Sequence, residues 1–70
     1  MSREVIIDYT NHRGKRRERR IKPTMSNCLR FEDNEWHPET QWLLYAYDME
    51  RHGWPLRSFA MKNIHSWRPA

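Results

Sequence analysis

The sequence predicts a mostly β fold, a small half-open antiparallel barrel of about four or five strands with a short C-terminal 3-10 or helical turn. Residues 41–48 form the only unbroken run of large apolar residues, and residues 4–10 alternate between apolar and polar side chains. The chain of 70 residues allows one domain, residues 1–70. A chain of this length buries only about 60% of its unfolded surface. We therefore expect modest stability and a homodimer that buries further surface.

The run at residues 41–48 predicts a central strand, because successive side chains of a strand point to opposite faces. Both faces would be apolar, with Leu43, Tyr45 and Tyr47 on one and Trp42, Leu44 and Ala46 on the other. A helix after Thr40 is the alternative, but an amphipathic surface helix would interleave polar residues. We expect residues 43–46 to be nearly inaccessible to solvent. The three aromatic side chains of the run could stack on nucleobases, but we expect them in the core.

Two further strands precede this run. Residues 4–10 place Val5, Ile7 and Tyr9 on one side, which is typical of a half-buried strand. The loop at residues 11–14 ends in Gly14, which can take the positive φ of a hairpin. Residues 15–22 then predict a basic strand paired to the first, with one face in solvent, and Pro23 ends it because proline cannot donate to the ladder.

The remaining elements are shorter. Residues 29–31 have the spacing of a short strand, and the Asp-Asn pair at residues 33–34 predicts a turn. Residues 56–61 predict a returning strand after the turn that contains Gly53. Ile64 and Trp67 lie three residues apart, which suits one helical or 3-10 turn over an open end of the sheet. Half-open barrels of the SH3 or Sm type protect the edges of such a sheet.

The positive charge is concentrated in the first part of the chain. Residues 1–30 carry nine Lys or Arg against three acidic residues, whereas residues 31–70 carry four against six, which together give the net charge of +4. Such concentration suggests an anionic partner. A solvated strand face that keeps the protein soluble is the other interpretation of the same residues.

Other functional classes find little support in the sequence. The four histidines and Cys28 are scattered singly, without the close spacing of a zinc site, and the glycines form no phosphate-binding loop. We expect no cofactor, no metal and no enzymatic activity. A single cysteine cannot form an intramolecular disulfide, and no apolar run approaches the roughly 20 residues that span a bilayer. We therefore expect a cytoplasmic protein without a membrane partner.

Several short motifs together resemble the WYL domain family. They are Ile7-x-Tyr9, Gly14, Arg19-x-Ile21-x-Pro23, the run Trp42-Leu43-Leu44-x-Ala46-Tyr47-Asp48, and Arg57-x-Phe59. The resemblance implies a Sm-like, SH3-type barrel that senses a ligand, with nucleic acid or nucleotides as the favoured candidates, in proteins of transcription regulation. The middle tyrosine of the family motif is Leu43 here, and two later arginines of the family are Ala60 and Asn63.

Two functional hypotheses follow. In the first, a stand-alone regulatory module binds nucleic acid or a nucleotide through basic side chains; the candidates are Arg16, Arg17, Arg19, Arg20, Arg57 and Lys62. In the second, the protein docks on a protein partner or on itself through aromatic side chains near loops, for which Trp36, Trp54 and Trp67 are the candidates. Convergence of Arg19 and Arg57 on one concave surface would favour the first hypothesis, and divergence the second.

Overall fold

The computed structural model describes residues 3–70, so the first two residues of the predicted domain lie outside the described part. Six strands and one 3-10 helix make up the fold: β1 (Val5–Thr10), β2 (Arg16–Pro23), β3 (Leu29–Glu32), β4 (Gln41–Asp48), β5 (Leu56–Ala60), η1 (Met61–Asn63) and β6 (Ile64–Pro69). All strand pairs are antiparallel. No helix among the described residues is long and apolar enough to cross a membrane.

Strand β4 is the centre of the sheet, as its apolar sequence predicts. One of its edges pairs with β5, and the other pairs with β2 near Asp48 and with β3 near Gln41. The Thr24 N–H donates to the carbonyl oxygen of Tyr45, and the Tyr45 N–H donates to the carbonyl oxygen of Cys28. Thr24 and Cys28 thus both pair with Tyr45, and the residues between them form a loop. Both edges of β4 are therefore used along most of its length.

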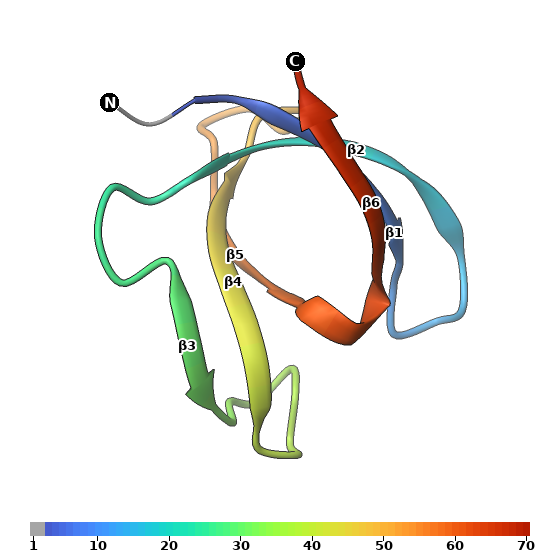
Figure 1. The fold of residues 1–70 in the computed structure, drawn as a ribbon, viewed down its shortest axis with the longest axis vertical. Coiled ribbons are helices and arrows are strands. Elements are labelled where there is room, and N and C mark those ends of the chain that lie inside the picture. The colour runs from blue at the N-terminus through green and yellow to red at the C-terminus, as the bar shows by residue number, and fades with distance from the viewer. Residues whose placement is uncertain (1–2) are drawn as a thin grey trace.

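The sheet curls until its two ends approach each other. Strands follow the order β3-β4-β2-β1-β6, with β5 on the other edge of β4, and η1 joins β5 directly to β6 (Figure 1). The Tyr9 hydroxyl crosses the remaining gap and accepts a hydrogen bond from the Ala60 N–H at 3.2 Å. The predicted small half-open antiparallel barrel is confirmed, but it has six strands where the sequence predicted four or five.

The core lies inside the curled sheet. It consists of Ile7, Tyr9, Ile21, Leu44, Ala46 and Phe59. Tyr9 and Phe59 meet edge to face, with ring centroids 5.1 Å apart, an arrangement that aromatic quadrupoles favour. Burial raises the pKa of the Tyr9 hydroxyl above its ordinary value, since the neutral phenol is the form that an apolar core tolerates.

The C-terminal segment differs from the prediction. Ile64 and Trp67 do not lie on a helical turn but on β6, which pairs with β1, and the 3-10 turn lies just before them at Met61–Asn63. The spacing of two apolar residues could not distinguish the two structures. The difference arises because β1 has a second edge to satisfy, and β6 provides its hydrogen-bond partners.

The expectation that Trp42, Tyr45 and Tyr47 are core residues is wrong for two of them. Trp42 is 52% exposed and Tyr47 is 40% exposed, and Tyr45 is half-buried. Strand β4 is longer than the enclosed interior, so Trp42 lies beyond the end of the interior. Tyr47 instead points to the outer face, opposite Leu56 and Lys22. Leu43, Leu44 and Ala46 are buried, as predicted, whereas Tyr45 is more exposed than the prediction for residues 43–46.

Candidate functional site

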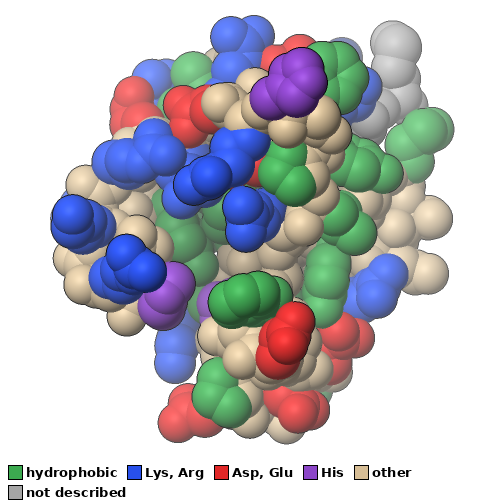
Figure 2. Space-filling view, turned by 180° about the vertical axis from the view of Figure 1, so that it is seen from behind, with side chains coloured by type: hydrophobic (Ala, Val, Ile, Leu, Met, Phe, Trp, Pro, Cys, Tyr) green, Lys and Arg blue, Asp and Glu red, His purple; other side chains and the backbone are tan. Residues whose placement is uncertain are grey.

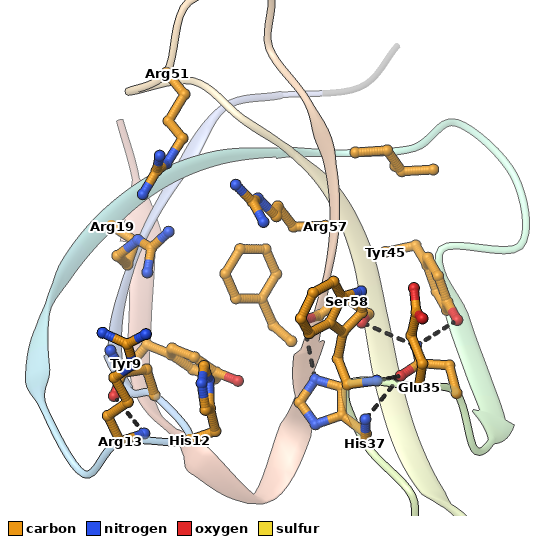
Figure 3. Close-up of a pocket in the computed structure, with 15 residues that line it drawn as sticks. Tyr9, His12, Arg13, Arg19, Glu35, His37, Tyr45, Arg51, Arg57 and Ser58 are labelled. Carbon is orange, nitrogen blue, oxygen red and sulfur yellow. Dashed lines mark hydrogen bonds between the residues drawn. The ribbon is translucent and has the colours of Figure 1, made fainter.

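A pocket of about 620 Å³ lies at the open side of the barrel (Figure 3). Its wall combines aromatic side chains with basic ones, and residues from β1, β2, β4 and β5 meet there with residues of three loops. The volume is within the range of about 300–1,000 Å³ that is typical of small-molecule sites. Four arginines line the pocket against one carboxylate, Glu35. The pocket therefore has the chemistry of an anion site.

Arg19 is the most deeply placed of these arginines. On β2 the side chains of Arg17, Arg19 and Ile21 share one face, and the burial of Ile21 in the core draws Arg19 inward. The Arg19 Nη2 donates to Asp48 Oδ2 at 3.1 Å, and its guanidinium lies 5.7 Å from the centre of the Phe59 ring. Its Nε has no hydrogen-bond partner in the described part of the chain and is 3.9 Å from the carboxylate of Glu50. Arg19 is thus held in one orientation at the pocket wall.

Arg57 reaches the same space from the opposite wall. It lies on β5, while Arg51 comes from the turn after β4, and Figure 3 shows both guanidinium groups and that of Arg19 extending toward one space. Arg51 has a carboxylate 3.5 Å away, that of Asp48. Arg57 and the pocket residue Arg13 have no ion-pair partner among residues 3–70. Two cationic groups therefore remain free to meet a ligand.

The loop before β4 supplies the third side of the pocket. The Asn34 Oδ1 accepts hydrogen bonds from the N–H groups of Trp36 and His37, and its Nδ2 donates to the hydroxyls of Tyr45 and Ser58. The His37 ring nitrogen lies 3.2 Å from the Ser58 carbonyl oxygen. These bonds fix the loop against β4 and β5 and hold the 66% exposed indole of Trp36 at the rim.

The structure separates the remaining predicted basic residues from this pocket. Arg16 and Arg20 lie on the outer face of β2, where Arg16 makes two hydrogen bonds to Asp8 and Arg20 lies 2.7 Å from Glu4. Arg68 on β6 makes a third such pair, with Glu18. The outer face thus carries alternating charges that neutralise one another.

Arg17 and Lys62 occupy intermediate positions. The Arg17 Nη1 donates to Glu50 at 3.1 Å, and Lys62 lies 3.7 Å from Glu39 beside a smaller hollow that shares Trp36 with the main pocket. Figure 2 shows Lys and Arg side chains gathered over one part of the molecular surface, next to hydrophobic side chains. Of the six basic candidates, only Arg19 and Arg57 line the main pocket.

The outer ion pairs predict a stability that depends on pH. Hydrogen bonds from Arg16 and Arg68 hold the pKa values of Asp8 and Glu18 below their ordinary values of 3.8 and 4.5. A carboxylate with a lowered pKa stabilises the fold above its unfolded pKa and loses this contribution as the pH falls through the folded pKa. We expect the midpoint temperature of thermal unfolding to decrease when the pH is lowered below about 4.5. The decrease should be smaller in Asp8→Asn, which lacks one of the two carboxylates.

The control for this prediction is Glu35→Gln, because Glu35 makes no ion pair among the residues described. Its acid profile should match that of the wild type. If the thermal midpoint of Asp8→Asn decreased with falling pH as steeply as that of the wild type, the outer ion pair of Asp8 would not contribute to the pH dependence of stability.

Sequence reasoning missed much of the pocket. Arg13, Arg51 and Asn34 were not candidates, although the Asp-Asn pair before β4 indicated a turn in which an asparagine bonds its own backbone. Trp54 and Trp67 are exposed, but neither lines the pocket. No cluster of three or more potential metal ligands occurs among residues 3–70.

Comparisons of the chain with models of known families, with curated proteins and with solved structures found no match.

Proposed function

We propose that this protein is a non-enzymatic, regulatory ligand-binding module that takes a nucleotide, or the end of a single nucleic-acid strand, in the basic pocket. The observation that carries the proposal is the convergence of Arg19 and Arg57 on one pocket from different strands. This is the arrangement that distinguished the ligand-binding hypothesis from the docking hypothesis. The resemblance to WYL domains agrees with it, since both arginines belong to the matching motifs.

The phosphate would be held by the free arginines. Arg57 and Arg13 lack carboxylate partners among residues 3–70, and a guanidinium can donate two parallel hydrogen bonds to one phosphate. Arg19 adds a fixed positive charge at the wall, although Asp48 neutralises part of it. A phosphate on the outer face would have to displace the carboxylates of Glu4, Asp8 or Glu18, so that face is a poorer site.

The base would meet the aromatic side of the pocket. The exposed indole of Trp36 lies at the rim, and stacking of one base on an aromatic side chain contributes about 1–3 kcal/mol. Ser58 and His37 provide polar groups within the same wall. A regulatory ligand sensor of this kind would act in the cytoplasm, where nucleotides are abundant.

The test is fluorescence anisotropy with labelled nucleotides, single strands and duplex at physiological salt. Arg57→Ala should weaken nucleotide binding by about tenfold or more, because a charge-assisted hydrogen bond is worth about 1.5–3 kcal/mol. Trp36→Ala should weaken it by a similar factor. With about three phosphate contacts, log affinity for single strands should fall against log salt with a slope near −2.

The matched control is Arg16→Ala, which removes the same charge from the outer face and should leave affinity nearly unchanged. Equal losses in Arg16→Ala and Arg57→Ala would mean that net charge alone drives binding. Absence of any binding tighter than about 10⁻⁴ M, the weak end of non-specific association, would contradict the proposal.

Docking on a protein partner is the second candidate function, and one observation favours it. Phe31 and Trp42 are both exposed, lie on neighbouring strands and contact each other with ring centroids 5.3 Å apart. Exposed aromatic pairs of this kind are typical anchors of protein interfaces.

A further inference from the structure

Strand β3 has one open edge. It pairs with β4 alone and lies at the margin of the sheet (Figure 1). The residues Leu29–Glu32 include neither lysine nor proline, the residues that commonly protect an edge strand from pairing with another chain. This edge is therefore available to a further strand.

The hydrogen-bond pattern shows which residues face that edge. The Tyr45 N–H donates to the Cys28 carbonyl oxygen, and the register then places Arg30 opposite Leu43. Because antiparallel pairs alternate between bonded and non-bonded, the backbone groups of Cys28, Arg30 and Glu32 point toward β4. Those of Leu29 and Phe31 point to the open edge.

The side chains of β3 are divided between two faces. Phe31 is 59% exposed and packs beside Trp42 on one face, while Leu29, which is 48% exposed, lies on the same face. On the other face, the Arg30 guanidinium lies 4.5 Å from the centre of the Tyr45 ring, and the Tyr45 hydroxyl donates to Glu32 at 2.6 Å. One face of the edge is thus apolar, and the other carries a positive and a negative charge.

We propose that two copies of this chain associate by antiparallel pairing of their β3 strands about a two-fold axis at Phe31. In this register each Phe31 exchanges two backbone hydrogen bonds with Phe31 of the second copy. Arg30 then lies directly opposite Glu32 of the second copy, and the symmetry repeats this pair. The apolar faces continue as a row of four aromatic rings, from Trp42 and Phe31 to the same residues of the second copy.

The charges select this register among the neighbouring ones. Only residues whose backbone groups face the edge can form the bonded pairs, so the register shifts in steps of two residues. The neighbouring symmetric registers place Arg30 opposite Arg30, or Glu32 opposite Glu32, and like charges directly opposite each other are destabilising. None of the residues Leu29–Glu32 lines the basic pocket. The paired edge therefore lies outside the pocket, although Tyr45, which contacts both Arg30 and Glu32, lines the pocket.

The test is a charge swap followed by sedimentation. We expect the wild type to form a species of twice the 8.7 kDa chain mass at about 100 μM. The single variants R30E and E32R should each raise the dimer dissociation constant about tenfold or more, because each places like charges opposite one another twice. An equimolar mixture of the two variants should restore the dimer, since the two chains then present opposite charges at both positions.

Mixing also separates the interface from folding, because a folding defect in either variant would persist in the mixture. Phe31→Pro provides a second test: the Phe31 N–H faces the open edge, so proline removes an intermolecular bond without removing a bond to β4. This variant should be folded by circular dichroism and monomeric. A monomeric wild type at about 100 μM, a mixture no more dimeric than its components, or a dimeric Phe31→Pro would each overturn the proposal.

Discussion

Replacing Leu44 with alanine is expected to lower the free energy of unfolding by about 2–5 kcal/mol. Leu44 is 3% exposed and packs in the core with Ile7, Ile21 and Phe59, so the shortened side chain leaves a cavity. Domains of this size have only a few kcal/mol of stability, and the variant should be largely unfolded near physiological temperature. Chemical denaturation followed by tryptophan fluorescence measures the change.

The matched control is Leu56→Ala, because Leu56 is the same residue type but is 54% exposed on β5. Its loss of stability should stay below about 1 kcal/mol. A loss of stability in Leu44→Ala as small as that of Leu56→Ala would show that Leu44 is not in the core, and would remove the physical basis for a central β4.

Asp48→Asn is expected to cost about 2–4 kcal/mol of stability. The Asp48 carboxylate is 1% exposed, pairs with Arg19 and Arg51, and accepts a hydrogen bond from the Glu50 N–H. The substitution keeps the shape of the side chain and removes its charge, which leaves the partly buried Arg19 without its main counterion. Because water in the open pocket reaches both arginines, we expect a smaller loss of stability than for a fully buried ion pair.

The same variant should bind a nucleotide more tightly, because the charge of Arg19 becomes available to the ligand. Lower stability with higher affinity is a combination that general damage to the fold does not produce. Glu50→Gln is the control: its carboxylate lies 3.1 Å from Arg17 and 3.9 Å from Arg19 but is more exposed, so its loss should cost below about 1 kcal/mol. Weaker binding by Asp48→Asn at a temperature where it is folded would contradict the assignment of the pocket.

The strands are the part of the fold that local sequence predicts well. Alternation in residues 4–10, the glycine before the basic strand, and the two-sided apolar run each reflect the geometry of a single strand or turn. The structure has these elements at β1, at Gly14 with φ of 80°, and at β4. Strand β4 has the predicted bounds, and β1 begins one residue later than predicted.

Exposure at the ends of a strand is harder to predict. The pattern treated every side chain of the run as covered, so it placed in the core both Trp42, which lies beyond the end of the interior, and Tyr47, which points to the outer face. Whether a side chain is covered depends on how far the neighbouring strands extend, and the interior ends before β4 does. Strand β6 also could not be recognised from Ile64 and Trp67 alone, because its partner strand is β1, at the opposite end of the sequence.

By itself, the sequence determined a small curled β-sheet, a basic second strand and the exposure of Trp36, Trp54 and Trp67. These features depend on residue type and on the period of two within each strand. Only the tertiary structure decided which basic residues could serve a ligand. It gave Arg16 and Arg20 carboxylate partners on the outer face and brought Arg19 and Arg57 to one pocket. The physical reason is that charge pairing and pocket formation depend on distances across strands, which the curl of the sheet sets.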